Sequence, residues 1–366
     1  MARYRNALPQ MTDGVTMLTD GGLETTLIYR DGIELPHFAA CELLRSEHGW
    51  RVLLDYFDEN AAIAREAGLP FNVDSPTWRA NPDWSARLGY SRDEFEEVNR
   101  EGIRLAEEVR LRYETPETPV VIAGVVGPRG DGFHPRTRHS AAEAAEYHFR
   151  QVAVFADTEA DYVSGLTFTY SDEAIGLARA AEAAAMPVVI SFTVETDGLL
   201  ASGESLRQAI YAVDRETDVY PEYYMVNCAH PSHLPAEIDA HDAWVHRIRG
   251  LRANASTRSH AEIEAAGGPD EGDAEALALH FRALRQRIPQ LTVMGGCCGS
   301  DSRYTRAIAD ALTPARRMTV TPTTATMATT AVTAAGTEMR SPVSRPTTTQ
   351  ARPQQSATVG ANRPLP

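Results

Sequence analysis

Residues 120–126 read VVIAGVV, an unbroken apolar run rich in β-branched side chains. A strand buried on both faces shows this pattern, whereas a strand with one solvated face alternates apolar and polar residues. Other short segments share this character, and the full set covers residues 16–19, 71–74, 120–126, 162–168, 187–194, 223–228, 245–253 and 291–295. The sequence therefore predicts eight buried parallel strands.

Helix signals separate these apolar segments. Ser91 with Glu94, and Ser140 with Glu143, form the S-x-x-E pattern that satisfies free backbone N–H groups at a helix start. The alanine-rich stretch 174–185 favours a helix by propensity. Strand–helix alternation repeated eight times is typical of a (β/α)₈ TIM barrel. We predict an α/β fold in which residues 1–313 form this barrel.

The composition changes near residue 314. Residues 318–366 consist mainly of Thr, Ala and Pro, with few large apolar side chains. Such a segment cannot bury enough apolar surface to offset the entropy lost on ordering. We expect residues 314–366 to form a disordered C-terminal tail.

The bulk composition excludes several classes of function. The 50 acidic residues outnumber the 35 basic ones, so the chain lacks the basic face of a nucleic-acid-binding protein. It has no run of about 18 apolar residues that could cross a membrane, and its first ten residues lack the apolar core of a secretory signal. Four cysteines are too few for a disulfide framework. We expect a cytoplasmic protein that binds neither nucleic acid nor membranes.

Three of the cysteines occupy two motifs at predicted strand ends. Cys297 and Cys298 lie in the stretch GGCCG, residues 295–299, directly after the eighth strand, and Cys228 ends the sixth strand. Strands six and eight have the same parity and flank strand seven, and their C-terminal ends open onto the same mouth of a barrel. The glycines permit the unusual φ/ψ values that would turn both adjacent cysteines toward one ion. The sequence thus predicts a metal site on Cys228, Cys297 and Cys298.

Three thiolates suit Zn²⁺, and a missing fourth protein ligand indicates a catalytic site rather than a structural one. Zn²⁺ with three thiolates has a net charge of about −1, which favours activating a thiol over activating water. No catalytic residue beyond the zinc site is then required. Packing cysteines, a vicinal disulfide and a zinc hydrolase are the alternatives, together with a barrel that binds zinc or thiols without turnover.

Two other strand ends carry candidate binding residues. Asp20, Gly21 and Gly22 follow the first strand, where glycine N–H groups could hold a carboxylate and Asp20 an ammonium. A plain turn explains this motif equally well. Asn254 follows the seventh strand and is placed to face the mouth, with loop packing as the alternative.

These motifs together resemble the homocysteine S-methyltransferase family, over about residues 14–313. The resemblance rests on Asp20-Gly21-Gly22-Leu23-Glu24-Thr25, Val125-Val126-Gly127-Pro128, Ser191-Phe192-Thr193-Val194, Asn227-Cys228 and Gly295-Gly296-Cys297-Cys298-Gly299, which occur in this order. It implies a (β/α)₈ barrel, zinc on the three cysteines and L-homocysteine as the thiol that is methylated to methionine. It also implies that Asp20, Gly21 and Gly22 contact the amino-acid end of the substrate, and we expect Asn227 to bind the substrate as well.

The chain departs from the family pattern after the fourth strand. Many members of the family carry a glutamate there that holds the substrate amine, whereas residues 166–170 read LTFTY. Glu195, at the end of the fifth strand, is a candidate replacement. A different small thiol therefore remains an alternative substrate. The methyl donor stays open among S-methylmethionine, S-adenosylmethionine, betaine and a methylfolate.

Overall fold

The computed structural model describes residues 2–133, 137–235, 238, 240–270 and 272–313. Its eight strands close into a barrel in chain order, and every neighbouring pair is parallel. The strands are β1 (Met17–Leu18), β2 (Phe71–Asp74), β3 (Val120–Val126), β4 (Tyr162–Phe168), β5 (Val188–Phe192), β6 (Tyr223–Ala229), β7 (Ile248–Ala253) and β8 (Val293–Gly296). This confirms the predicted (β/α)₈ barrel. The predicted tail, residues 314–366, lies outside the described residues.

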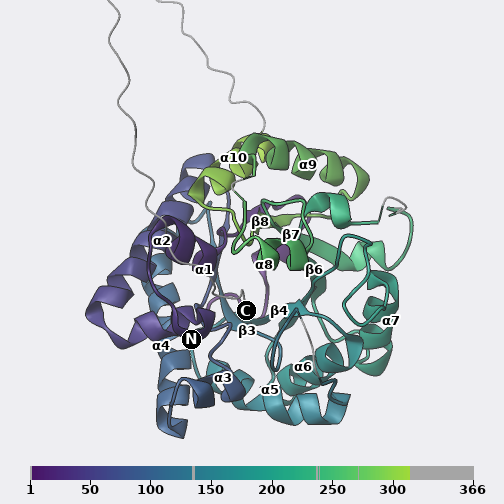
Figure 1. Cartoon of the computed structure of the whole chain (residues 1–366). Coiled ribbons are helices and arrows are strands. Elements are labelled where there is room, and N and C mark those ends of the chain that lie inside the picture. Colours follow the sequence, from purple (N-terminus) through teal and green to yellow (C-terminus); the bar gives the residue numbers. More distant parts are fainter. Residues whose placement is uncertain (1, 134–136, 236–237, 239, 271, 314–366) are drawn as a thin grey trace, which may run out of the picture. The chain divides into compact units, whose positions relative to one another are not determined.

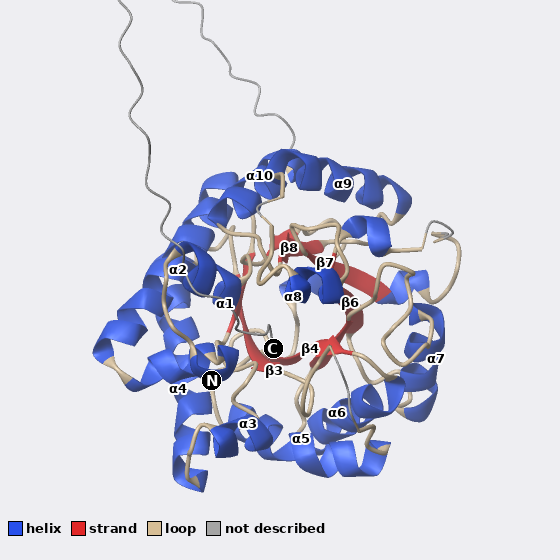
Figure 2. Cartoon of the chain, viewed as in Figure 1, coloured by secondary structure: helices blue, strands red, loops and turns tan. Residues whose placement is uncertain are grey.

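Helices surround the ring of strands, as Figure 2 shows by colour. They follow the strands in chain order around the barrel (Figure 1). The α-helices are α1 (Leu23–Thr25), α2 (Glu47–Ala67), α3 (Pro82–Arg87), α4 (Arg92–Tyr113), α5 (Ala141–Ala156), α6 (Ser171–Ala183), α7 (Leu206–Glu216), α8 (His260–Ala265), α9 (Ala274–Arg287) and α10 (Ser302–Leu312). Both S-x-x-E patterns are confirmed as reciprocal helix caps at the starts of α4 and α5.

The N-terminal end of the barrel interior is closed by an apolar cluster. Side chains from the first residues of several strands fill it, including Met17, Tyr162 and Tyr223, and Leu8 joins them from the segment before β1. The Gln10 amide donates to the Tyr223 hydroxyl across 3.3 Å. This end is therefore packed shut, and the strand ends at the opposite face remain for a site.

The ends of the strands differ in small ways from the expected ranges, and two differences shape that face. Strand β1 stops at Leu18, so residues 19–22 form a loop instead of extending the strand. Strand β6 continues to Ala229, but its pairing with β7 is irregular between Asn227 and Ala229. Both differences occur at the C-terminal mouth of the barrel.

In the described part of the chain, we find no helix with the length and apolar character needed to cross a membrane.

Candidate metal centre

The three predicted cysteines converge at the C-terminal mouth of the barrel. The Cys228 Sγ atom lies 2.9 Å from Cys297 Sγ and 3.6 Å from Cys298 Sγ. All three sulfur atoms lie within 4.8 Å of one another, and the described residues contain no second group of three such ligands. Tetrahedral zinc with bonds of about 2.3 Å separates its sulfur ligands by about 3.8 Å. The cluster therefore fits one ion of this size with small side-chain adjustments.

An unusual backbone conformation at Cys228 directs its side chain into the mouth. The residue has a φ of 52°, in the left-handed region, at the irregular end of β6. In a regular strand, Asn227 and Cys228 would point to opposite faces, yet both line the same pocket. Hydrogen bonds stabilise the conformation, because the Cys228 carbonyl accepts from His260 Nε2 at 2.7 Å and from Thr193 Oγ1 at 3.4 Å.

The glycines beside Cys297 and Cys298 serve mainly close packing. A Cβ atom on Gly295 would lie 2.0 Å from Thr19 Oγ1, and one on Gly296 would lie 1.9 Å from Ser300 Oγ. Within this motif only Gly299 has a positive φ. The expected reason, unusual φ/ψ values throughout the motif, is thus wrong for Gly295 and Gly296. The loop needs small residues because it packs directly against the segment that follows β1.

The crowding of the three thiols affects their ionisation. Hydrogen bonds from the Cys228 and Cys298 thiols hold the pKa of Cys297 well below its usual range. The same cluster raises the pKa of Cys228, chiefly because its thiol donates to the Cys297 sulfur. One negative charge therefore forms readily and opposes the next. A divalent cation would remove this opposition, so the donor set is chemically suited to a metal ion.

A pocket beside the cysteines contains the charged groups of the mouth. The Asp20, Glu24 and Asp74 carboxylates and the Arg252 guanidinium line it. Aromatic side chains form much of the remaining wall, namely Phe38, Phe57, Trp78 and Phe133. Carboxylates outnumber the one guanidinium, so the pocket favours cationic groups over anionic ones.

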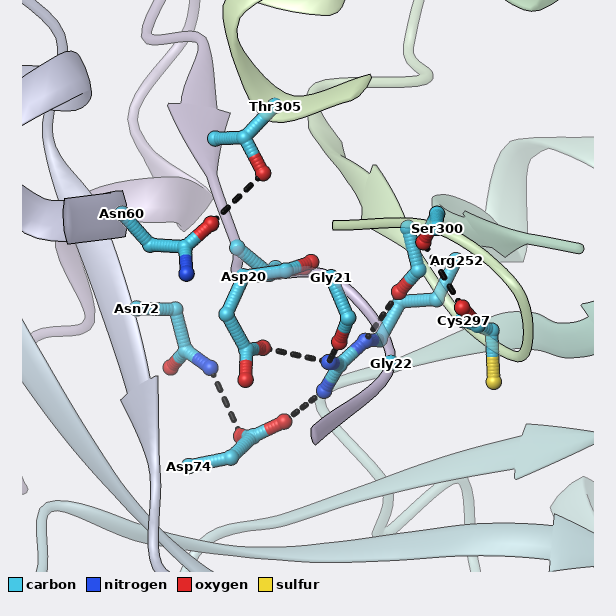
Figure 3. A network of polar contacts seen from close by, with 12 residues as sticks. Asp20, Gly21, Gly22, Asn60, Asn72, Asp74, Arg252, Cys297, Ser300 and Thr305 are labelled. Carbon is cyan, nitrogen blue, oxygen red and sulfur yellow. Dashed lines mark hydrogen bonds and ion pairs between the residues drawn. The ribbon is translucent and has the colours of Figure 1, made fainter. Parts of the chain in front are cut away.

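Arg252 connects four strand ends through a buried network, shown in Figure 3. Its guanidinium forms close ion pairs with Asp20 and Asp74. It also donates to the Gly21 carbonyl at 3.1 Å and the Gly296 carbonyl at 3.2 Å. Because Gly296 immediately precedes Cys297, Arg252 fixes the loop that carries two of the cysteines. Burial raises the pKa of Asp20, while Arg252 and the Tyr56 hydroxyl oppose this rise.

The predicted segment after β1 lies against the cysteine loop. A Cβ atom on Gly21 would lie 2.7 Å from the Ser300 carbonyl oxygen, and one on Gly22 would lie 2.4 Å from the Cys297 carbonyl oxygen. Asp20, Gly21 and Gly22 all line the pocket. The Asp20 carboxylate is engaged within the protein, by Arg252 and by the Tyr56 hydroxyl at 3.1 Å. Its contact with a substrate ammonium stays a prediction.

The other predicted binding residues are divided between the pocket and its surroundings. Asn227 lines the pocket, and its amide exchanges hydrogen bonds with the backbone N–H and the hydroxyl of Thr167, both at 2.8 Å. Thr167 has a φ of 67°, so Asn227 stabilises a strained residue. Glu195 and Asn254 do not line this pocket. Glu195 instead contacts His260 Nδ1 at 2.9 Å.

Three polar residues of the site were not among the predicted ones. Arg252 and Asp74 lie at the C-terminal ends of their strands, where a charged side chain in an apolar segment is a usable signal. Glu24 lies within the quoted motif after the first strand, but its motif position alone assigns no role to it. All three line the pocket beside the cysteines.

Comparison with known proteins identifies several relatives. The family profile described as homocysteine S-methyltransferase matches residues 17–312. A curated protein from Zea mays, homocysteine S-methyltransferase 4, is 25% identical over 326 residues, which cover 82% of this chain and 90% of that protein.

Solved structures of one bacterial protein resemble the barrel. The oxidised form of the homocysteine methyltransferase MmuM from Escherichia coli superposes with a TM-score of 0.62 at 18% identity, over 84% of this chain and 99% of that one. Its metallated form gives a TM-score of 0.61 at 17% identity, over 82% and 98% of the two chains. At this level of identity, the likeness concerns the fold.

Proposed function

The chain belongs to the homocysteine S-methyltransferase family, and we propose that it transfers a methyl group to the thiol of L-homocysteine, giving methionine, in a zinc-dependent reaction. One observation carries the proposal: three cysteine sulfurs from two strand ends lie within 4.8 Å of one another beside a pocket. We assign the activity to residues 1–313. Because the thiols must remain reduced, a cytoplasmic location is part of the proposal.

Cys228, Cys297 and Cys298 would hold Zn²⁺ and leave one position for the substrate sulfur. When bound, zinc supplies the positive charge that lets an incoming thiol bind as a thiolate at neutral pH. Three negatively charged ligands keep that sulfur electron-rich, which suits attack on a methyl carbon. Arg252 and the backbone of the Gly21–Gly22 segment hold the cysteine loop in place. No general base is needed, and the chain's main tasks are alignment and exclusion of water.

The lining of the pocket supports a cationic methyl donor. Three carboxylates face one guanidinium, and aromatic rings such as Trp78 and Phe133 form part of the wall. Aromatic faces and negative charge favour sulfonium and quaternary ammonium groups. S-methylmethionine, S-adenosylmethionine and betaine carry such groups, whereas the glutamate portion of a methylfolate is anionic. We therefore rank the onium donors above methylfolate.

The test combines a metal assay with a methyl-transfer assay. Purified zinc-loaded protein is incubated with L-homocysteine and each of the four donors, and methionine is measured by mass spectrometry. We expect one bound zinc per chain and methionine from at least one onium donor. Cys298→Ala should lose both zinc and activity.

Cys41 provides the matched control, because it is a buried cysteine of the apolar core. Cys41→Ala should keep zinc and activity once its folding has been verified by circular dichroism. Methionine formation by protein free of zinc would refute the mechanism. Zinc binding without methionine from any donor would instead support a barrel that binds zinc without turnover.

A further inference from the structure

The pocket must recognise the amino-acid end of its substrate as well as the sulfur. An α-amino acid presents an ammonium group, and a buried ammonium requires a carboxylate or several hydrogen-bond acceptors. The C-terminal end of β4 contributes Leu166 and Thr167 to the pocket but no acid. The ammonium partner must therefore be sought among the carboxylates on the pocket wall, which are Asp20, Glu24 and Asp74.

Two of these three carboxylates already have a cationic partner within the protein. Asp20 and Asp74 share Arg252, one on each terminal nitrogen of the guanidinium. Their other oxygens accept hydrogen bonds, Asp20 from the Tyr56 hydroxyl at 3.1 Å and Asp74 from the Asn72 amide at 2.8 Å. Each carboxylate thus has both charge compensation and hydrogen bonds. An ammonium bound to either would compete with a buried ion pair.

Glu24 differs from both in its environment. It lies on α1, directly after the glycine segment that packs against the cysteine loop. Within the described residues, no arginine or histidine forms an ion pair with its carboxylate, and no other side chain donates a hydrogen bond to it. Its electrostatic neighbours are Cys297 and Asp20, which are negative when ionised, and Arg79, which acts on it without forming an ion pair. A carboxylate in this position is stabilised by any cation that enters the pocket.

Glu195, the acid after the fifth strand, does not line the pocket. It contacts His260, and the same histidine donates to the Cys228 carbonyl. Glu195 therefore supports the backbone of a cysteine residue rather than the pocket wall. This leaves Glu24 as the pocket carboxylate that forms no ion pair with another described residue.

We propose that Glu24 is the specificity-determining residue that receives the ammonium group of the amino-acid thiol. The inference rests on the proposed function, because it assumes that the thiol substrate is an amino acid. The ammonium lies away from the reacting sulfur, so Glu24 contributes mainly to binding. Its loss should raise KM and leave kcat nearly unchanged.

The test compares two thiols that differ only in the amino group. L-homocysteine and 4-mercaptobutyrate share the chain length, the thiol and the carboxylate. In the zinc-loaded wild-type protein, we expect kcat/KM for homocysteine to exceed that for 4-mercaptobutyrate by about 10- to 100-fold, the usual range for a charge-assisted contact. Glu24→Gln should remove most of this difference by lowering the homocysteine value alone.

Two further variants keep the test decisive. Glu24→Asp retains the charge and should preserve part of the discrimination, even if the glutamine variant folds poorly. Glu59→Gln, on the exposed surface of α2, is the matched control and should resemble wild type. Equal losses for both thiols in Glu24→Gln, or unchanged discrimination, would overturn the assignment while the methyltransferase function stands. A wild-type protein that methylates no amino-acid thiol would overturn both.

Discussion

Replacing Arg252 by methionine tests whether the buried charge network holds the mouth of the barrel together. The substitution keeps an extended side chain but leaves Asp20 and Asp74 without their shared cation, and all three residues are at most 7% exposed. Removing one partner of a buried ion pair costs about 3–5 kcal/mol, because the remaining charge is uncompensated. We expect a fall in melting temperature of roughly 5–10 °C at pH 7.

The pH dependence identifies the cause of this loss. Burial already raises the pKa of Asp20, and the loss of Arg252 removes the charge that opposes this rise. A raised carboxyl pKa makes stability fall as pH rises through the folded value, and the penalty vanishes below the unfolded value of about 4. The difference between Arg252→Met and wild type should therefore shrink as the pH falls from 7 toward 4. Thermal unfolding followed by circular dichroism measures both proteins.

Two comparison proteins complete the experiment. Arg306→Met removes an exposed ion pair with Glu66 and should cost less than about 1 kcal/mol. Adding Asp20→Asn and Asp74→Asn to Arg252→Met should recover much of the lost stability, since the uncompensated charges are gone. The reasoning is refuted if Arg252→Met unfolds within 1–2 °C of wild type, or if its deficit is independent of pH.

Three further predictions concern the surroundings of the cysteines. His260→Ala removes the donor to the Cys228 carbonyl. It should weaken zinc binding by about 10- to 100-fold, measured in competition with a chelator. An unchanged zinc affinity would contradict this prediction. Gly22→Ala places a Cβ atom 2.4 Å from the Cys297 carbonyl oxygen. The substitution should lower both the zinc content and the melting temperature. Wild-type values of both would show that the cysteine loop can shift to accept the methyl group. Burial, as the largest cause, raises the pKa of Glu24 to about 7, so its contribution to stability is lost as the pH rises through 7. Metal-free Glu24→Gln should therefore lose less stability than wild type between pH 5 and 8 in urea unfolding, and parallel curves would rule this out.

The barrel itself was accessible from the sequence because its signals are local. Continuous apolar runs indicate strands buried on both faces, and the serine–glutamate caps at the starts of α4 and α5 indicate helix ends. Strand boundaries were less accessible. The predicted seventh strand includes residues 245–247, yet they form a 3₁₀ turn before Ile248. Boundaries depend on neighbouring strands, which a linear pattern does not contain.

The cysteine cluster followed from sequence and topology together. Residue type predicted the ligand chemistry, and the shared direction of the strands placed Cys228 on the same mouth as Cys297 and Cys298. The reason for the flanking glycines was accessible only in three dimensions, since Gly295 and Gly296 are required by contacts with Thr19 and Ser300. The contact between Gly295 and Thr19 joins residues almost the full length of the barrel apart in sequence.

The sequence by itself determined the fold class, the location of the mouth and the three cysteines that gather there. Only the tertiary structure decided which charged residues of the mouth form ion pairs with one another. Asp20 and Glu24 are four positions apart in one motif, yet Asp20 pairs with Arg252 of β7 while Glu24 has no such partner among the described residues. Local patterns arise from neighbours along the chain, whereas the partner of a buried charge is chosen by strands that meet only when the barrel closes.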